Sequence, residues 1–352
     1  MNILVTGGAG YIGSHAVKRL LADGHAVTVV DNLSRGHSEA VDALMPVADG
    51  RLAFEEADIV DEAAMKRVMS ERAIDTVMHF AALAYVGESV DEPLRYFYNN
   101  TTGALALLRA CEALNVERFI FSSTCATYGE PPEDFIPIAE TCPQIPINPY
   151  GWSKLFVERM LRDYANARRA QGDTTFAYAA LRYFNVAGSD PDGLIGEDHD
   201  PETHLIPVVL QAALGKRDAI TIFGTDYDTP DGTCVRDYVH VNDLIDAHVT
   251  VMNALTDGDE RIYNLGIGRG YSVREIIDAA RHVTGVDFPV KEGERRAGDP
   301  PTLYADPSKI HTELGWAATH TDVHEIIRHA WDWFKAHPDG YTGRDDEQQP
   351  RA

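Results

Sequence analysis

Short apolar runs alternate with longer amphipathic segments over the first two-thirds of the chain. Runs rich in Val, Ile and Phe predict strands at residues 3–5, 26–30, 52–55, 76–80, 118–122 and 175–181. Between the strands, apolar residues recur at helical spacing over residues 12–23 and 103–114. This alternation of strands with helices predicts an α/β fold built on a parallel, doubly wound sheet.

A proline-rich stretch at residues 130–149 interrupts this pattern. Its six prolines exclude a regular element, so we expect a loop that crosses the surface and leads into a new helix. Asn148 is suited to cap that helix, and Pro149 is suited to its first turn.

Beyond Asn185 the pattern becomes less regular. Residues 190–207 read as irregular, residues 237–241 and 262–265 as short strands, and residues 273–283 as a helix. We expect two domains, each made of two segments: residues 1–182 with about 236–266, and about 183–235 with 267–341. The second is the smaller α/β unit, and the polar residues 342–352 are expected to form a disordered tail.

Composition narrows the classes of partner. The chain has 352 residues, 44% of them hydrophobic, and a formal net charge of -24. A chain with this negative charge repels nucleic-acid backbones and anionic lipids. We therefore expect neither nucleic acid nor a membrane as a partner. The sequence has no run of about 18 apolar residues that would predict a membrane span, and the N-terminus lacks the pattern of a signal peptide.

The four cysteines also carry information. Cys111, Cys125, Cys142 and Cys234 are scattered, without the C-x-x-C spacing of zinc knuckles or redox motifs. They are typical of reduced thiols, so we expect a cytoplasmic protein. We predict no metal ligands.

A glycine-rich turn follows the first strand and precedes the first helix. Gly7, Gly10 and Gly13 are spaced G-x-x-G-x-x-G, which suits a tight turn, close approach of a pyrophosphate and close packing of the helix. Asp31 ends the second strand, where a carboxylate accepts hydrogen bonds from the ribose of NAD and repels the 2′-phosphate of NADP. Arg35 lies four residues further on and leaves NADP open, because an arginine at such a place can bind the 2′-phosphate.

Two further strand ends complete the predicted cofactor site. Asp58 and Ile59 follow the third strand and are candidates for contact with the adenine. The strand at residues 76–80 runs into Phe80, Ala81, Ala82 and Leu83, and its small residues allow a dinucleotide to lie against the backbone. Together with the glycine turn, these residues predict a Rossmann-type NAD site.

A candidate catalytic group lies on the helix after Pro149. Tyr150 and Lys154 are four residues apart and therefore share one helix face. A nearby ammonium group, like a positive nicotinamide ring, lowers the pKa of a tyrosine and makes it a general base. Thr124 ends the strand Ser122-Ser123-Thr124 and offers a hydroxyl to the reacting oxygen.

These motifs, in this order, resemble those of the extended short-chain dehydrogenases/reductases, and closely those of the UDP-hexose 4-epimerases within that family. The resemblance covers roughly residues 1–340 and rests on segments 5–15, 87–89, 148–151, 181–185 and 231–238. It implies a tightly held NAD⁺, a transient 4-keto-sugar with bound NADH, and interconversion of UDP-galactose and UDP-glucose in galactose metabolism. It makes Tyr150 the base, Lys154 the residue that tunes it, and Thr124 an assisting hydroxyl.

The same resemblance implies further contacts. Those to NAD add Tyr11, Ile12, Asn32, Asn99 and Tyr183. Those to the UDP-sugar add Asn185, His204, Leu205, Phe223, Arg236, Arg296, Asp299 and Leu303. Arginine suits a diphosphate because its planar fork binds two oxygens at once. For Arg295, a solvated surface role stays open.

Within the family, the two residues after Thr124 narrow the reaction. Dehydratases of this superfamily carry an acidic Asp-Glu pair there, whereas this chain has Cys125 and Ala126, which argues against dehydration. Leu303 occupies the position where hexose-restricted members carry a bulky tyrosine, so activity on UDP-N-acetylhexosamines stays open.

Several alternatives remain at this stage. A 4-epimerase of UDP-pentoses or UDP-uronates would use the same scaffold. A non-catalytic sensor is disfavoured by the intact Tyr150 and Lys154, and a nucleic-acid binder by the negative charge. The resemblance also implies a homodimer, with helices 104–114 and 153–169 as the candidate interface.

Overall fold

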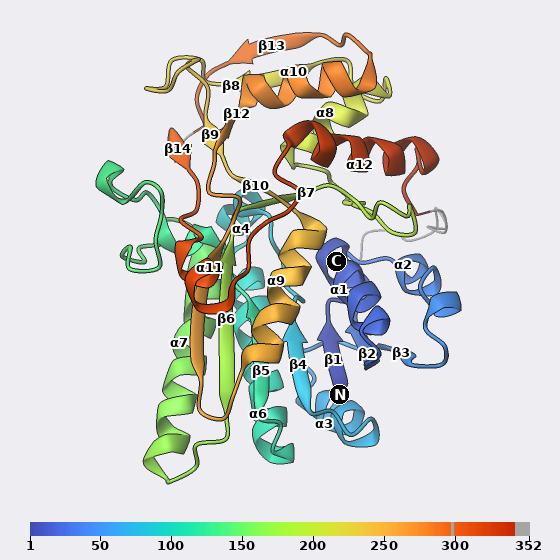
Figure 1. Cartoon of the computed structure of the whole chain (residues 1–352), viewed down its shortest axis with the longest axis vertical. Coiled ribbons are helices and arrows are strands. Elements are labelled where there is room, and N and C mark those ends of the chain that lie inside the picture. Colours follow the sequence, from blue (N-terminus) through green and yellow to red (C-terminus); the bar gives the residue numbers. More distant parts are fainter. Residues whose placement is uncertain (297–298, 342–352) are drawn as a thin grey trace.

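Seven parallel strands form the central sheet, in the order β11-β6-β5-β4-β1-β2-β3 (Figure 1). The computed structural model describes residues 1–296 and 299–341, so the predicted tail at 342–352 lies outside the described residues. The strands are β1 (Asn2–Thr6), β2 (Ala26–Asp31), β3 (Leu52–Glu56), β4 (Thr76–His79), β5 (Arg118–Ser122), β6 (Ala177–Tyr183) and β11 (Glu260–Leu265). This order confirms the predicted doubly wound α/β fold.

Helices cover both faces of this sheet because its strands are apolar on both sides. One face carries α1 (Tyr11–Ala22), α9 (Val241–Ala254) and α11 (Ser308–Leu314). The other carries α3 (Glu62–Glu71), α6 (Gly103–Leu114) and α7 (Pro149–Ala170).

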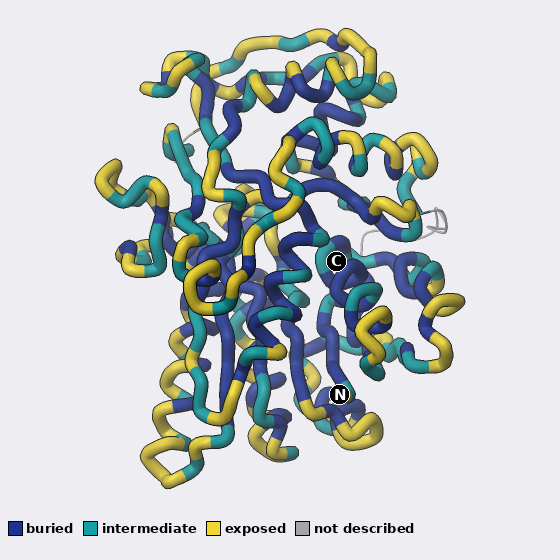
Figure 2. Tube along the Cα trace, in the orientation of Figure 1, coloured by how far each residue is buried: buried dark blue, intermediate teal, exposed yellow. Residues whose placement is uncertain are grey.

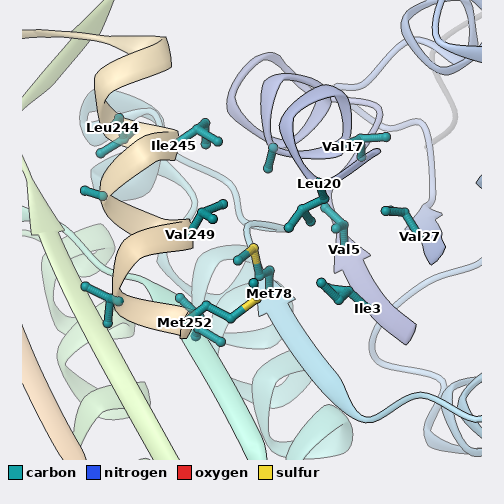
Figure 3. Close-up of a cluster of buried hydrophobic side chains, with 14 of the residues drawn as sticks. Ile3, Val5, Val17, Leu20, Val27, Met78, Leu244, Ile245, Val249 and Met252 are labelled. Atoms are coloured by element: carbon teal, nitrogen blue, oxygen red, sulfur yellow. The ribbon is translucent and has the colours of Figure 1, made fainter. Parts of the chain in front are cut away.

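The alternation of side chains along β1 shows how the two cores are divided. Ile3 and Val5 point into the core shared with α1 and α9, where Figure 3 shows them beside Leu20 and Met78, whereas Leu4 belongs to the core on the opposite face. All three strand residues are fully buried. Each such side chain contributes about 1.5–3 kcal/mol, so the central sheet is a rigid support.

A second group of elements packs above the carboxyl ends of the strands (Figure 1). Its core lies between three helices, α8 (Leu205–Ala213), α10 (Val273–Thr284) and α12 (Val323–Ala336). Helix α10 confirms the helix predicted at 273–283, and it begins with a capping box between Ser272 and Glu275.

Small sheets connect the two groups of elements. Their strands are β7 (Asn185–Ala187), β8 (Ile220–Phe223), β9 (Val235–Arg236), β10 (Tyr238–His240), β12 (Tyr271–Ser272), β13 (Val290–Gly293) and β14 (Thr302–Leu303). They pair as β10-β7, β12-β9-β14 and β13-β8.

The remaining helical elements are short. They are α2 (Ser38–Asp42), η1 (Met45–Val47), α4 (Val86–Asp91), α5 (Pro93–Tyr96), η2 (Phe97–Thr102), η3 (Cys125–Tyr128) and η4 (Glu133–Phe135). No helix in residues 1–296 and 299–341 is both long and apolar enough to span a membrane.

The proline-rich loop differs in part from its prediction. It contains no strand, as expected, but Ile138 and Cys142 are buried, so the loop does more than cross the surface. Ile138 forms a bridge with Ala305 and joins a small apolar cluster with it. Figure 2 shows how burial runs from the central sheet upward, with exposed residues mainly in the outer helices and loops.

Candidate functional site

The candidate site lies at the carboxyl ends of β1 and β4, where the strand order of the sheet reverses. Gly7 adopts φ +73, and a Cβ there would lie 2.6 Å from the backbone nitrogen of Ala81. A Cβ on Gly13 would lie 2.0 Å from the carbonyl oxygen of Gly7. Both glycines are therefore required, one by the turn and the other by the close approach of α1.

The start of α1 has the properties of a dinucleotide cradle. Gly10 precedes the helix without any side-chain cap, and a Cβ there would meet nothing nearer than the Gly7 oxygen at 3.4 Å. Helix N-termini with free N–H groups bind phosphate, and Tyr11, Ile12 and Gly13 form this first turn. The residues present thus fit the pyrophosphate of a dinucleotide.

The carboxylate of Asp31 is held in place at the end of β2. One of its oxygens accepts from the backbone N–H of Ala9 at 3.1 Å, and the other accepts from Leu33 at 2.9 Å. Next to it, the Asn32 amide donates to Asp58 at 3.0 Å. The structure therefore brings three predicted cofactor residues together beside the glycine turn.

Arg35 has partners of its own. Its guanidinium donates to Glu88 at 2.6 Å and to the carbonyl of Asp200 at 2.5 Å, and it lies over the Tyr85 ring. Because its guanidinium already makes these contacts, Arg35 is poorly placed to bind a 2′-phosphate, so the structure favours NAD, as Asp31 predicts.

The loop after β4 is fixed by an asparagine that sequence analysis missed. The side chain of Asn100 accepts from the N–H of Leu83 and donates to its carbonyl, at 2.9 and 3.0 Å. It also donates to Ser153 on α7 at 2.9 Å. The predicted neighbour, Asn99, donates to Asn100 instead. Ile59 and Phe80 to Ala82 lie on the adjoining loops, and Ile59 packs against Gly103.

The predicted catalytic side chains meet at the carboxyl end of β5. Asn148 caps α7 by accepting from the N–H of Gly151 at 2.8 Å, which sets Tyr150 in the first turn. Lys154 Nζ, one turn later, donates to the carbonyl of Ser122 at 2.9 Å. Tyr150, Lys154 and Thr124 are all buried, at 8%, 3% and 6% exposure.

Burial controls the protonation of this group. It lowers the pKa of Lys154 from 10.5 to about 7. Burial also raises the pKa of Tyr150 well above its usual 10, with Tyr183 adding to the rise and the Thr124 hydroxyl opposing it. The predicted lowering of the Tyr150 pKa is therefore not a property of the protein alone, because Lys154 donates to Ser122 and is partly neutral at pH 7.

Tyr183 connects to the same strand end. Its hydroxyl lies 2.7 Å from Ser122 Oγ, while the carbonyl of Ser122 accepts from Lys154. Ser122 thus links the predicted cofactor contact Tyr183 with the lysine of the Y-x-x-x-K motif.

A buried ion pair lies next to the carboxyl end of β5. Glu158 on α7 accepts two hydrogen bonds from Arg182 on β6, at 2.9 and 2.6 Å, and one from Ser123 at 2.5 Å. Arg182 also donates to the Tyr128 hydroxyl at 2.9 Å. Sequence analysis missed this pair, because nothing in a spacing of 24 residues indicates contact between a helix and a strand.

The predicted substrate residues fall into two groups. Arg236 on β9 pairs with Asp299 at 3.2 Å and is the registered neighbour of Leu303 on β14. The guanidinium of Arg296 lies 4.0 Å from the centre of the Phe223 ring. The N–H of Asp299 donates to the carbonyl of Arg296 at 3.4 Å and so connects the two groups, and Leu303 packs against the same small apolar cluster as Cys125. We call these five residues the substrate wall.

The other substrate candidates lie on separate elements. Asn185 is exposed and donates to the carbonyl of Asp237 at 3.3 Å. His204 and Leu205 stand at the start of α8, where His204 packs against Tyr85. Arg295 pairs with Asp226 on the surface, which supports its solvated role.

Cys125, the residue after Thr124, has the properties of a packed side chain. Burial raises the pKa of its thiol to about 12. It packs against the small cluster of Tyr128, Phe184 and Ala305, which also contains Leu303. The position where dehydratases carry an acid therefore holds an apolar contact in this chain.

Comparisons with known proteins agree with this geometry. A model described as the NAD dependent epimerase/dehydratase family matches residues 3–266. The chain is 50% identical over 346 residues to the probable UDP-arabinose 4-epimerase 1 of Oryza sativa subsp. japonica, covering 97% of this chain and 81% of that protein. It is 49% identical over 345 residues to the UDP-glucose 4-epimerase of Lacticaseibacillus casei, covering 98% and 100%.

A solved structure is similarly close. The UDP-glucose-4-epimerase from Stenotrophomonas maltophila with bound NAD and formylated UDP-arabinopyranose matches with a TM-score of 0.90 and 43% identity. The match covers 96% of this chain and 99% of that chain.

Proposed function

Because this chain belongs to the NAD dependent epimerase/dehydratase family, we propose that it interconverts UDP-galactose and UDP-glucose by inverting C4 of the hexose. The near full-length similarity to a UDP-glucose 4-epimerase supports this assignment. Cys125 and Ala126 follow Thr124, where dehydration requires an acidic pair.

One observation carries the proposal. The hydrogen bond from Lys154 to the Ser122 carbonyl fixes the first turns of α7 against the end of β5. It places Tyr150 at the same edge of the sheet as the glycine turn that fits a dinucleotide. A base, a hydroxyl at Thr124 and a cofactor cradle thereby share one edge of the sheet, as oxidation and reduction at a single carbon require.

Each side chain of this catalytic group has a role in the inversion. Tyr150 removes the proton from the 4-hydroxyl and later returns it, and Thr124 hydrogen-bonds the same oxygen. Lys154 holds the cofactor ribose and supplies positive charge beside Tyr150. When bound, NAD⁺ supplies the hydride acceptor that makes the inversion possible.

The substrate wall is assigned on its charge and shape. Arg236 and Arg296 are the cations for the diphosphate, Asp299 accepts from the uridine ribose, and Phe223 contacts the uracil. We keep the division into a cofactor-binding part, residues 1–182 with about 236–266, and a substrate-binding part, residues 183–235 with 267–341.

The direct test is conversion of UDP-galactose by the purified protein without added cofactor, followed by chromatography of the nucleotide sugars. We expect UDP-glucose to accumulate and the bound NAD to be recovered on denaturation. If NAD is recovered but no UDP-glucose forms, the hexose assignment is wrong.

A second substrate has specific support. A relative 50% identical over 346 residues is called a probable UDP-arabinose 4-epimerase, and the same C4 inversion serves a pentose. Leu303 next to Arg236 leaves open which sugars the wall admits, N-acetylhexosamines and uronates included. Rates with UDP-arabinose, UDP-N-acetylgalactosamine and UDP-galacturonate, compared with UDP-galactose under one set of conditions, rank these substrates.

We further propose a cytoplasmic homodimer acting in galactose metabolism. The outer faces of α6 and α7 expose Leu105, Trp152 and Phe156, at 45%, 38% and 41%, which is costly for an isolated chain. The four cysteines are free thiols, as suits a reducing compartment. Sedimentation analysis of the wild type and of Phe156→Glu tests the dimer, which the charge is expected to dissociate.

A further inference from the structure

Four metal-ligating side chains converge in the loop that leads into α8. They are Glu197, His199, Glu202 and His204, and one ligand atom from each lies within 4.8 Å of all the others. In the sequence, Glu-x-His occurs at 197–199 and again at 202–204. Sequence analysis predicted no metal ligands and overlooked this repeat.

The distances within the cluster match those of a coordination shell. His204 Nδ1 lies 2.9 Å from Glu202 and 3.4 Å from Glu197. His199 Nδ1 lies 3.2 Å from Glu197 and 3.5 Å from Glu202. Ligands about 2.1 Å from a tetrahedral metal ion are separated by about 3.4 Å. The four histidine–carboxylate distances, which involve both oxygens of Glu202, are close to this value, and the four ligand atoms all lie within 4.8 Å of one another, so a small adjustment would close the shell.

The cluster holds two buried carboxylates whose charge is compensated by protonated histidines or by a bound cation. The side chains of Glu197 and Glu202 are each only 3% exposed. Within residues 1–296 and 299–341, neither carboxylate forms a salt bridge with a lysine or an arginine. Both pair with the two histidines, and Glu202 also accepts from the backbone N–H groups of Thr203 and His204. Two buried carboxylates are costly unless a positive charge compensates both.

One nitrogen in the cluster independently points to a ligand. His199 Nδ1 is buried and, among the described residues, has no hydrogen-bond partner of acceptable geometry, although oxygens of Glu197 and Glu202 lie 3.2 and 3.5 Å away. Its ring also contacts Tyr11 and Tyr85 edge-on, which fixes the orientation of the imidazole. A fixed, buried nitrogen between two carboxylates is suited to coordinate a metal ion, which on binding would displace any proton that the nitrogen carries.

We propose that these four residues bind one divalent transition-metal ion of the zinc class. Imidazole nitrogens with carboxylate oxygens are borderline ligands, which suit Zn²⁺ and Co²⁺ better than Mg²⁺ or Ca²⁺. Four protein ligands complete a tetrahedral shell, so the site is structural. His204 is 41% exposed on its side chain and provides the route of entry.

The ion would tie the loop before α8 to the dinucleotide turn. His199 packs against Tyr11, the first residue of α1, and Tyr11 donates to the carbonyl of Gly188 at 2.6 Å. Fixing residues 197–204 also fixes His204 and Leu205, which we assign to the substrate side. The metal would therefore stabilise the boundary between the cofactor and substrate regions.

The test uses the full-length protein, freed of metal with a chelator and then desalted. Calorimetric titration with Zn²⁺ is expected to give one site per chain. Thermal unfolding is expected to show a higher melting temperature with Zn²⁺ than without it. Titration with Co²⁺ is expected to give the intense visible absorption of a tetrahedral ion.

Matched variants distinguish this site from casual binding at surface histidines. His199→Asn and His204→Asn are expected to weaken Zn²⁺ binding at least ~10-fold and to abolish the tetrahedral Co²⁺ spectrum. The control His324→Asn removes a histidine that, among the described residues, pairs with one carboxylate, Asp322, and should leave both signals unchanged. His204→Asn alters an accessible side chain and serves if His199→Asn does not fold.

Two results would overturn the proposal. The first is a wild-type protein that takes up no stoichiometric Zn²⁺ after chelation. The second is a folded variant that retains both the affinity and the tetrahedral spectrum of the wild type. In either case the cluster is an ion-paired network of protonated histidines, and the proposed epimerase activity is unaffected by that outcome.

Discussion

Replacing Lys154 with methionine should make the protein more stable while abolishing its activity. The ammonium group is 3% exposed, donates to one backbone carbonyl and lies over the Phe121 ring, but within the described residues it pairs with no carboxylate. A buried lysine without a counter-ion is kept for function at the expense of stability.

The magnitude derives from the change in pKa. Burial lowers the pKa of Lys154 from 10.5 to about 7. At 1.36 kcal/mol per unit of pKa, this shift lowers the free energy of unfolding at pH 7 by about 5 kcal/mol, relative to a side chain at this position that does not titrate. Methionine removes this cost but leaves the Ser122 carbonyl without its donor, a loss of about 1–3 kcal/mol. The net gain is about 2–4 kcal/mol.

The sign of the pH dependence is fixed. Between pH 7 and 10.5 the unfolded chain binds the lysine proton and the folded chain does not, so the stability of the wild type rises with pH. Lys154→Met lacks this contribution. Its advantage over the wild type should therefore be largest at or below pH 7 and about 2.7 kcal/mol smaller at pH 9.

Melting temperatures of the dinucleotide-free proteins at pH 7 and pH 9 test this reasoning. An unfolding entropy of about 2.1 cal/mol/K per residue over 352 residues converts the gain at pH 7 into about 3–5 °C. Lys309→Met is the matched control, because Lys309 also donates to a strand carbonyl and lies over a tyrosine ring but is only half-buried. A Lys154→Met protein that melts below the wild type at pH 7, or whose gain is the same at pH 9, would refute the argument.

The same site yields three further expected outcomes. Tyr150→Phe should lower kcat about 10²–10⁴-fold with an unchanged melting temperature, and a smaller loss in steady-state assays would remove Tyr150 as the base. Asp31→Asn should weaken NAD binding about 10-fold or more while leaving UDP binding intact, since a charge-assisted bond of about 1.5–3 kcal/mol is lost; equal losses for both ligands in calorimetry would indicate a general defect. Glu158→Ala should cost about 3–5 kcal/mol, or roughly 4–7 °C in melting temperature, because Arg182 stays buried and charged. The double variant with Arg182→Met should recover much of that loss, and strictly additive losses would show that the pair is not coupled.

Sequence reasoning reached the regular elements because long periodic segments carry their own signal. The strand at 118–122 and the helix at 103–114 match their predicted limits, and the cap at Asn148 lies where its residue type predicts. Strands of two to four residues, such as β9 and β14, were not predicted in full because they are too short to show a period.

Contacts between distant segments were beyond the reach of the pattern. The positive φ of Gly7 and the close contact between Gly13 and Gly7 lie within one βα unit, so both could be inferred from the motif, whereas the close approach of Ala81 to Gly7 could not. The Glu158–Arg182 pair and the loop-fixing Asn100 depend on how helices and strands pack, which spacing does not encode. The pKa of Tyr150 differed from prediction for the same reason, because the burial that raises it is a tertiary property.

Two charged residues one turn apart on α7 explain why the lysine is left unpaired. Lys154 and Glu158 are four residues apart, a spacing at which an ion pair normally forms on a helix. Arg182, Ser123 and Gln144 instead supply four hydrogen bonds to Glu158 and occupy both of its oxygens. The buried arginine thus keeps the carboxylate away from the lysine. Within the described residues Lys154 therefore has no counter-ion and keeps a low pKa, which leaves it available to the cofactor and Tyr150, and the adjacent ion pair provides the rigidity that this arrangement needs.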